Sequence, residues 1–392
     1  IPKGYSYDYI NAEVIMDRLT VKDGRFVLPD GMSYKVMVLP PFNTMRPELL
    51  KKIEQLIQQG GVVLGPKPEK SPSLENFPAC DNEVKALADK LWSGKYTDGK
   101  MTVTYGSGQL MDGYELSEVF ADLELPKDVD VSSDAPVLWT HRSTADMDIY
   151  FISNQSDNEL HLAPVFRTNK KWRPQLWDAV SGEIRALPDF ELTDTGIKVP
   201  LKMEPAQSWF VVFTSDAGVK SAYSENFPDY KNVNAVEGPF MVDFVNKDIA
   251  PQAPVVFDEL IDWKNSRDEQ IKYYSGTAVY TTSFTMNELP QKQDVFLNLG
   301  KVSVMAKVKL NGQYLGGVWM APYRLNITDA IKAGENTLEI EVVNLWRNQL
   351  IRDKSRAEDE KYTWIVTDKI TPESPLHSSG LLGPLVIEAV KY

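Results

Sequence analysis

The sequence contains little cysteine and little histidine. Its 392 residues include one cysteine, Cys80, and three histidines, His141, His161 and His377. One thiol cannot form an intramolecular disulfide, so a disulfide-built scaffold is excluded, while the redox compartment stays open. Three histidines this far apart, with one cysteine, do not supply the ligand set of a zinc site.

Long apolar runs and clusters of positive charge are also absent. No apolar run approaches the ~18 residues that a membrane-spanning helix needs. The net charge is -13 without a stripe of Lys and Arg, so nucleic acid is not expected as a partner. A hydrophobic fraction of 43% at this length indicates roughly two to four folded domains. Because the chain opens with Ile1 and Pro2 and no Met, we expect a cut end, and the lack of a signal peptide says little about secretion.

The first part, residues 1–125, has the pattern of an α/β domain with a parallel sheet. An apolar run at 34–39 is typical of a strand that is buried on both faces. A helix is predicted at 47–59, with Gly60 and Gly61 as its stop, and a second buried strand follows at 62–64. This order is a βαβ unit, so the two strands are expected to be parallel. Further elements are predicted as a helix at 12–19 capped by Asn11, a helix at 82–92 and a strand at 100–105.

The helix at 12–19 has no strand before it to pack upon. We therefore expect a truncated α/β domain, flavodoxin-like or amidotransferase-like, whose first strand lies upstream of Ile1. Gly60 and Gly61 precede a strand and not a helix, so they are not a phosphate-binding loop of the dinucleotide type.

From about residue 130 the hydrophobic period changes to two. The segments 137–155, 160–167, 173–187, 196–203 and 208–214 are predicted strands of a β-sandwich over residues 130–215. Residues 216–235 are polar and are predicted to be a linker.

The last part, residues 236–392, shows the most regular alternation in the chain. Val302, Val304, Ala306, Val308 and Leu310 share one face of a strand, and Asn311-Gly312 then forms a tight hairpin turn. A similar alternation at 277–286 and 336–346 predicts a jelly roll. The whole chain is thus expected to be multidomain and mainly β.

Two resemblances follow from these segments. The series YYSGTAVYTTSF, LNLGKVSVMAKVKLNGQYLGGVW and PYRLNITDAIKAGENTLEIEVVNLW resembles the galactose-binding-like jelly roll of family 2 glycoside hydrolases. The series YSYDYINAEVIMDRLTVKDGRFVLPDGMSYKVMVLP, KPEKSPSLENFPACDNEVKALADKLW, THRSTADMDIYFISNQ and PQLWDAVSGE resembles the region after the catalytic barrel in α-L-rhamnosidases of glycoside hydrolase family 106.

The resemblances imply a non-catalytic C-terminal portion of a secreted or periplasmic glycoside hydrolase that degrades plant-type or complex polysaccharides. Its expected partners are carbohydrate and an upstream catalytic barrel of the same polypeptide. The alternative is a free-standing structural or adhesion module whose aromatic loops contact protein. No catalytic residues are assigned, because Asp268-Glu269, the most suggestive carboxylate pair, lies in one loop and neighbouring loop residues seldom converge on one substrate.

Sugar binding uses aromatic faces together with fixed polar groups. The loop 316–324 and the segment 344–348 carry both at strand ends, and neighbouring connections add further rings. Each ring has core or inter-domain packing as its alternative, and a structural hydrogen bond is the alternative for His141 and Arg142. The carbohydrate-binding candidates are Trp319, Tyr323, Arg324, Asn344, Trp346, Asn348, Tyr273, Tyr274, Trp364, His141 and Arg142.

No cofactor is required by any motif. Jelly rolls of the kind this part resembles often hold a structural ion between the first and last strands. Oxygen ligands for such a calcium ion are available at Asp258, Glu259, Asp262 and Glu388, although no EF-hand spacing is present.

Overall fold

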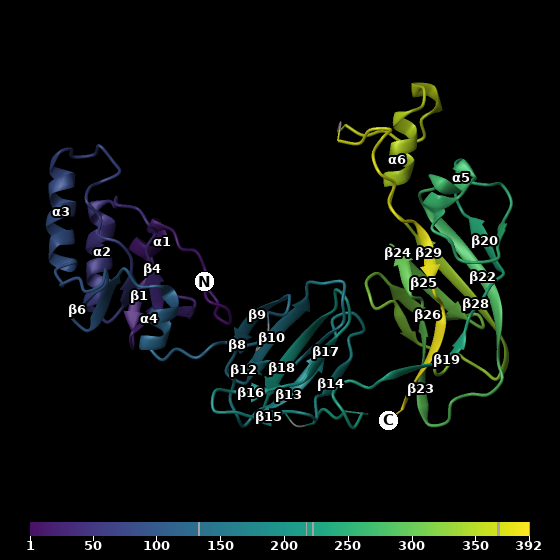
Figure 1. Cartoon of the computed structure of the whole chain (residues 1–392), viewed down its shortest axis with the longest axis horizontal. Helices are drawn as coiled ribbons and strands as arrows, with labels where there is room; N and C mark the ends of the chain where they lie inside the picture. Colours follow the sequence, from purple (N-terminus) through teal and green to yellow (C-terminus); the bar gives the residue numbers. More distant parts are fainter. Residues whose placement is uncertain (132–133, 217, 222, 367–368, 392) are drawn as a thin grey trace. The chain divides into compact units, whose positions relative to one another are not determined.

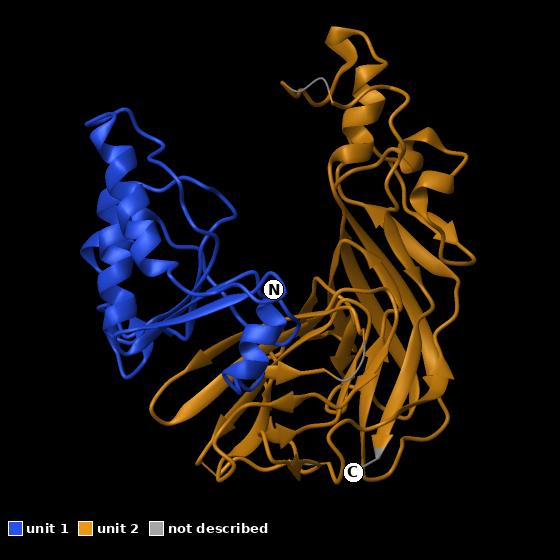
Figure 2. Cartoon of the chain, turned by 60° about the vertical axis from the view of Figure 1, so that its left-hand side comes forward, with its two compact units in different colours: residues 1–128 blue, residues 129–392 orange. Residues whose placement is uncertain are grey.

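The computed structural model describes residues 1–131, 134–216, 218–221, 223–366 and 369–391. The chain divides into two compact units, Ile1–Asp128 and Val129–Tyr392, which Figure 2 shows in blue and orange. Within the described ranges, no helix is long and apolar enough to cross a membrane.

The first unit contains a four-stranded sheet in the order β4-β5-β7-β6. Strand β4 (Val36–Val38) pairs in parallel with β5 (Val62–Leu64), and helix α2 (Pro47–Gln58) connects them. The predicted βαβ unit is therefore confirmed. Strand β7 (Gly108–Asp112) continues the parallel sheet, and β6 (Met101–Tyr105) closes it as an antiparallel edge.

Helix α2 ends as its sequence predicts. Gly60 has φ +115°, a conformation that glycine adopts without the penalty that a Cβ brings. Its N–H donates to the carbonyl of Ile57, and the N–H of Gly61 donates to the carbonyl of Leu56. These two bonds form a Schellman motif, so the glycines are a helix stop.

The strand predicted at 34–39 is interrupted. Tyr34 pairs with the small antiparallel sheet β1-β2-β3, while the parallel strand starts at Val36. Val38 is 50% exposed because β4 is the edge of its sheet, so the expectation of burial on both faces was wrong for this strand. The likeness of the whole unit to flavodoxins or amidotransferases stays a prediction.

The remaining elements of this unit are one long helix, α3, and several short helices and strands. Asn11 caps the first helix, as predicted, by accepting a hydrogen bond from the N–H of Val14. The bounds are α1 (Ala12–Asp17), β1 (Thr20–Lys22), β2 (Arg25–Val27), β3 (Ser33–Tyr34), α3 (Ala79–Leu91) and α4 (Leu116–Asp122).

The second unit begins with a β-sandwich. A five-stranded sheet has the order β14-β13-β18-β10-β9, a four-stranded sheet has the order β15-β16-β12-β8, and β11 pairs with β17. The segment 137–155 is a hairpin and not one strand, because the hydroxyl of Thr144 bonds Asp146 and closes a turn there without glycine or proline. The bounds are β8 (Val129–Asp130), β9 (Val137–Ser143), β10 (Met147–Asn154), β11 (Leu160–Leu162), β12 (Val165–Phe166), β13 (Arg173–Trp177), β14 (Ile184–Ala186), β15 (Glu191–Leu192), β16 (Ile197–Lys198), β17 (Leu201–Met203) and β18 (Ser208–Thr214).

The segment predicted as a linker is partly structured. Asn226 is buried and bonds the backbone of Asp189 and Pro200, while Phe227 packs beside Trp209. Residues 230–235 form β19 (Tyr230–Ala235), which pairs with β30. The polar composition of residues 230–235 predicted a linker, but these residues form a strand. β19 lies at the edge of its sheet, where polar side chains can stay in solvent.

The C-terminal part of this unit, shown in green and yellow in Figure 1, has a six-stranded sheet in the order β21-β20-β22-β28-β25-β26. The alternating residues Val308, Leu310, Leu338 and Ile340 are buried, as their pattern predicts. The turn at Asn311-Gly312 is confirmed by positive φ angles at both residues. The bounds are β20 (Phe240–Phe244), β21 (Val255–Phe257), β22 (Thr277–Met286), β25 (Met305–Leu310), β26 (Gln313–Val318) and β28 (Gly334–Val343).

A four-stranded sheet, β19-β30-β23-β27, and the pair β24-β29 complete this part. The predicted strand at 302–310 is divided into two strands with different partners. Strand β24 pairs with β29, while β25 pairs with β28 and β26. The bounds are η1 (Trp263–Asn265), α5 (Glu269–Lys272), β23 (Gln293–Asn298), β24 (Lys301–Ser303), β27 (Arg324–Asn326), α6 (Arg347–Lys354), η2 (Glu358–Glu360), β29 (Gly380–Gly383) and β30 (Val386–Lys391).

Candidate carbohydrate-binding surface

Strand register brings several predicted loops to one end of the six-stranded sheet. In the pairing of β25 with β28, Met305 lies opposite Val343, and in its pairing with β26, Ala306 lies opposite Val318. Strand β22 begins at the same level, with Thr277 opposite Val343. The chain therefore leaves β26 and β28 and enters β22 at one end of the sheet.

Aromatic residues gather in these connections. Trp319 follows β26, Trp346 follows β28, and Tyr273 precedes β22. Strands β26 and β28 are separated by β25 alone, which corresponds to about 10 Å between their axes. We call the five residues Tyr273, Trp319, Trp346, Tyr362 and Trp364 the aromatic rim.

Three tryptophans of the rim present their rings to solvent. Trp319 is 52% exposed, Trp346 is 47% exposed and Trp364 is 83% exposed. The rings of Trp346 and Tyr362 are stacked, with their centroids 6.1 Å apart and an interplanar angle of 17°. Open aromatic faces of this kind can stack on the C–H face of a sugar ring.

Helix α6 adds a cation beside the rim. The guanidinium of Arg352 lies 5.6 Å from the ring centroid of Tyr273, and Figure 1 shows α5 and α6 at the same end of the domain. Burial lowers the pKa of Arg352, although the group stays a cation at neutral pH. The side chain of Arg352 is 11% exposed and lies 3.7 Å from Glu269, so it packs beside Tyr273 and is not an open donor for a ligand.

The backbone beneath Tyr362 is fixed by a buried carboxylate. Asp353 is 2% exposed and accepts hydrogen bonds from the N–H groups of Tyr362 and Thr363, at 3.1 and 2.7 Å. The amide of Asn246, which follows β20, donates to the phenol oxygen of Tyr362 at 2.8 Å. These bonds hold the Tyr362 ring in place from two sides.

Two predicted amides are structural and do not face solvent. Asn344 accepts from the N–H of Gly276 and donates to the carbonyl of Tyr274. Asn348 clamps His377, accepting from its N–H and donating to its carbonyl. Both side chains are buried with their hydrogen-bonding groups in use, so their assignment to sugar binding was wrong.

Tyr274 is also part of the core. It is fully buried against Phe244 and Trp263, and its hydroxyl donates to the carbonyl of Thr277. Burial raises the pKa of Tyr274. Without an exposed face this ring cannot bind a ligand, although the neighbouring Tyr273 is only half-buried.

The rest of the loop 316–324 divides between packing and charge pairing. Tyr323 packs against the core, and burial raises its pKa. Arg324 pairs with Glu388 at 2.6 Å and with Glu204 at 2.8 Å, and its guanidinium lies 3.8 Å from the ring centroid of Tyr230. Burial alone would lower the pKa of Arg324, but the two carboxylates outweigh burial and raise it. Arg324 therefore joins three segments and is not a free sugar ligand.

His141 and Arg142 lie in the first sandwich, away from the connections that form the rim. His141 stacks on Tyr150 with ring centroids 4.0 Å apart, and its Nε2 lies 3.1 Å from the carboxylate of Asp148. Arg142 is exposed and donates to the carbonyl of His141. The structural alternative holds for His141, and neither of two pockets in the described part of the second unit is lined by His141 or Arg142.

The four calcium candidates are not brought together. Within the described ranges, no group of three or more His, Cys, Asp or Glu side chains is arranged to hold a metal ion. Glu388 is neutralised by Arg324, and Asp262 caps η1 by accepting from the N–H of Lys264. Asp258 and Glu259 are exposed. The geometry therefore does not support calcium at Asp258, Glu259, Asp262 and Glu388.

The carboxylate pair at 268–269 also has a local role. Asp268 caps α5 by accepting from the N–H of Gln270, and Glu269 is an exposed residue of the same short helix. No second carboxylate faces Glu269 among its described contacts, whereas Arg352 lies 3.7 Å from it.

Sequence reasoning missed Tyr362 and Arg352. Both lie in the segment 347–379, where the strand period is lost and no helical stripe stands out. The alternation of Tyr362, Trp364 and Val366 is the one signal that could have found the exposed side of this segment.

Family comparisons agree with this arrangement. Residues 1–191 match the family described as alpha-L-rhamnosidase, which is glycoside hydrolase family 106. Residues 252–376 match the family described as glycosyl hydrolase 2 galactose-binding domain-like. Both resemblances inferred from the sequence are thereby confirmed.

Two individual proteins are similar over nearly the whole chain. A solved rhamnosidase from Novosphingobium sp. PP1Y superposes with a TM-score of 0.82 at 28% identity, over 99% of this chain and 36% of its own. A protein of Formosa agariphila named "Putative beta-glucuronidase" is 24% identical over an alignment of 631 residues, which covers 99% of this chain and 53% of the relative. The chain thus spans about half of the curated relative and about a third of the solved one.

Proposed function

We propose that this chain, similar to α-L-rhamnosidases of family 106 and to the galactose-binding-like domain of family 2, is the non-catalytic C-terminal portion of a glycoside hydrolase. Its C-terminal part, a jelly roll by resemblance, binds carbohydrate and presents it to a catalytic barrel of the same polypeptide. The similarity of 99% of the chain to about a third of a solved rhamnosidase supports the placement within a longer enzyme.

One observation carries the binding role. Two strand connections place exposed aromatic rings at one end of the six-stranded sheet, and a third adds the half-buried Tyr273. The buried amides of Asn344 and Asn348 at this end already have their hydrogen bonds made. Core aromatics would be covered, as Tyr274 is. Plant-type or complex polysaccharide is the proposed ligand and a secreted or periplasmic location is proposed with it, in both cases from the resemblance.

Titration of the chain with rhamnose-containing pectin oligosaccharides tests this role. Trp319→Ala and Trp346→Ala should each weaken binding by about 1 to 3 kcal/mol, because each removes a stacking surface. Their melting temperatures should change little, since half of each ring is already in solvent. Phe42→Ala is the control, because Phe42 is also an exposed ring, 66% open to solvent, but lies in the first unit.

The same measurement distinguishes the alternative. If the unaltered chain has no affinity for these oligosaccharides, and Trp319→Ala lowers the melting temperature sharply, then the loop is packing and the proposal is wrong. If the rim binds no sugar, and the stably folded chain instead binds another protein through the rim, a structural or adhesion module is the better description.

The proposal also predicts that the chain alone hydrolyses nothing. No alternating series of strands and helices that could form a catalytic barrel is present in the described ranges. Release of rhamnose or galactose from aryl glycosides that persists through repeated purification would contradict the non-catalytic assignment.

A further inference from the structure

A concavity lies on the C-terminal part of the chain, outside the aromatic rim. Its volume is about 350 Å³, within the range of small-ligand pockets. Its lining comes from three segments and is mainly polar, with Leu315, Ile327 and Ala330 as the apolar members. Its principal lining residues are Asp294, Gln313, Tyr314, Asn326, Thr328 and Asp329.

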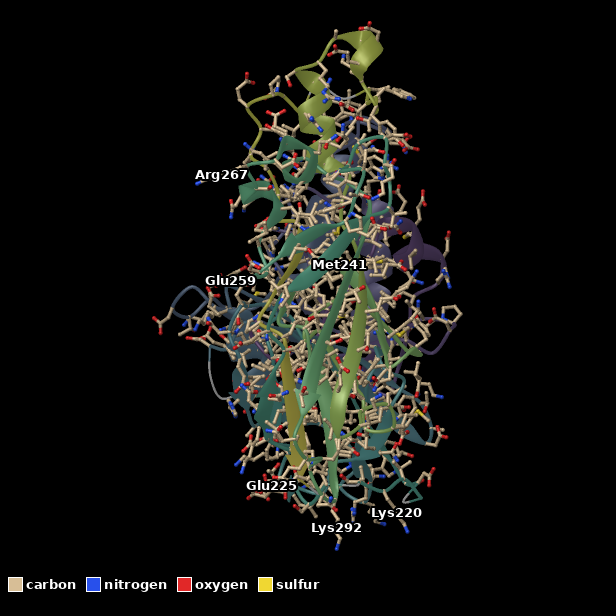
Figure 3. All side chains as sticks on the ribbon, turned by 90° about the vertical axis from the view of Figure 1, so that its right-hand side faces the viewer. Lys220, Glu225, Met241, Glu259, Arg267 and Lys292 are labelled. Atoms are coloured by element: carbon tan, nitrogen blue, oxygen red, sulfur yellow. The ribbon has the colours of Figure 1, made fainter. Side chains whose placement is uncertain are left out.

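Register places this pocket at the end of the domain opposite the rim. Gln313 follows the Asn311-Gly312 turn and pairs with Leu310, whereas the rim end of the same hairpin is at Val318. Figure 3 shows the two ends, with Lys292, which directly precedes β23, at one end and Arg267, which precedes α5, at the other. The pocket is therefore a separate surface and not a continuation of the rim.

Buried amides hold the wall of the pocket in place. Asn336 is fully buried, and its Nδ2 donates to the carbonyls of Lys332 and Gly334. Its Oδ1 accepts from the Nδ2 of Asn311, which also donates to the carbonyl of Ala330. The loop that carries Asp329 is thus bonded to the turn at Asn311-Gly312, and Tyr314 lies in the strand that directly follows this turn.

A hydroxyl fixes the other side. Thr328 accepts from the N–H of Val295 at 2.9 Å and donates to Asn326 at 2.7 Å. This joins the loop to β23, which carries Asp294. Three segments are therefore fastened together beneath the pocket, so its side chains are positioned before any ligand arrives.

Four side chains of the pocket have free hydrogen-bonding groups. Among the described residues, no hydrogen bond or ion pair joins the side chains of Asp294, Gln313, Tyr314 or Asp329 to a protein partner. Tyr314 is 58% exposed, so its ring is open to the solvent. No Lys or Arg is among the lining residues that the structure describes.

We propose that this pocket is a second carbohydrate site that binds a neutral sugar ring. The two carboxylates accept hydrogen bonds from hydroxyl groups, the Gln313 amide both donates and accepts, and Tyr314 provides a surface for stacking. Uronic acids and sulfated sugars are disfavoured, because two carboxylates without a cation repel them. The inference rests on the proposed role in carbohydrate binding, but it concerns a different surface.

Titration of the whole chain with monosaccharides, followed by NMR, tests the proposal. The probes are D-galactose and L-rhamnose as neutral sugars and D-galacturonate as the anionic counterpart of galactose. A neutral sugar should shift amide resonances of residues 313–315 and 326–330, and D-galacturonate should bind more weakly. Tyr314→Ala should weaken the neutral sugar by about fivefold, while Tyr314→Phe keeps the ring and most of the affinity.

Charge neutralisation provides the sharper arm. The double variant Asp294→Asn, Asp329→Asn should reduce or abolish the preference for D-galactose over D-galacturonate, because amides remove the repulsion. Trp319→Ala, at the opposite end, is the control that should leave these shifts unchanged. Loss of oligosaccharide binding at the rim with intact monosaccharide shifts at residues 313–315 and 326–330 would mean that the proposed rim function fails while this site stands.

Three results would overturn the site. These are no shift with either neutral sugar, equal binding of D-galactose and D-galacturonate, or a saturable Ca²⁺ response that Asp294→Asn removes without any sugar response. Melting temperatures of all variants should match the parent, because the substituted groups have no protein partners to lose. If Tyr314→Ala melts at a lower temperature than the parent, Tyr314→Ser takes its place in the same titration.

Discussion

The two β-sandwiches of the second unit use similar residues in different ways. In the first, His141 stacks on Tyr150 and bonds Asp148, so the histidine is committed to internal contacts. In the second, Trp319 and Trp346 leave about half of their ring surface open. The difference shows that a residue type marks a ligand site only where its contacts are not already made.

The same distinction applies within one loop. Asn344 and Asn348 flank Trp346, yet both amides are buried and paired while the ring is exposed. Buried polar groups must be hydrogen-bonded, and a short segment at a strand end can satisfy that need and still turn an aromatic side chain outward. Buried structural residues and an exposed ring therefore occur within the same short segment.

The largest expected effect comes from Arg324, the candidate most firmly committed to structure. Arg324→Ala should lower the free energy of unfolding by about 3 to 5 kcal/mol, because the buried carboxylate of Glu388 loses its partner. Urea unfolding measures this. Arg142→Ala is the matched control, expected within about 0.5 kcal/mol of the parent since its guanidinium is exposed. Equal effects of the two changes would contradict the assignment of Arg324.

A smaller effect is expected where an amide and a ring are compared directly. Asn348→Ala should destabilise the chain by about 1 to 3 kcal/mol, because the backbone groups of His377 lose their partner. Trp346→Ala should destabilise the chain less than Asn348→Ala does, and it should weaken sugar binding more. Thermal melting and oligosaccharide titration of both variants measure these effects. If Trp346→Ala is the more destabilising change and Asn348→Ala weakens sugar binding more, then Asn348 is not structural and Trp346 is not a binding residue.

Acid should affect the first sandwich through Asp148. Burial alone would raise the pKa of Asp148, but hydrogen bonds from His141, Ser143 and Thr168 outweigh it, so the pKa is lowered. Because the pKa of Asp148 is lower in the folded state, its ionised form stabilises the fold at any pH above the unfolded-state pKa of about 3.9. This stabilisation is lost as the pH falls through the folded-state pKa.

Asp148→Asn should therefore be less stable than the parent at pH 7, and the deficit should shrink as the pH falls below about 4. Unfolding by urea from pH 7 downward measures it. Asp157→Asn, at an exposed carboxylate, should follow the parent at every pH. A deficit that does not depend on pH would mean that shape, and not charge, sets the role of Asp148.

The smallest effect is local and extends the comparison to the first unit. Strand β4 is the edge of its sheet, so its outer backbone groups have no strand beside them. Amides of residues 36–38 should exchange with deuterium faster than those of residues 305–310, which lie between two strands. Equal protection of the two segments would mean that the edge is covered.

Sequence reasoning succeeded where one physical rule dominated. The alternation around Val308 and Leu338 predicted buried faces correctly, because a strand with one face in solvent must alternate. The βαβ unit and the glycine stop after α2 were predicted for similarly local reasons. It failed at residues 230–235, where a polar segment forms a strand because its partner β30 supplies the hydrogen bonds.

The sequence by itself determined the mainly β architecture, the parallel unit near the N-terminus and the family resemblance, since these depend on periodicity and turn residues within short stretches. Only the tertiary structure decided which candidates are available to a ligand. Arg324 and Glu388 are 64 residues apart and Arg324 and Glu204 are 120 apart, and no local pattern reports such partners. Burial and hydrogen-bond satisfaction are properties of neighbours in space, so the aromatic rim and the pocket beside Tyr314 became recognisable only after the strands were paired.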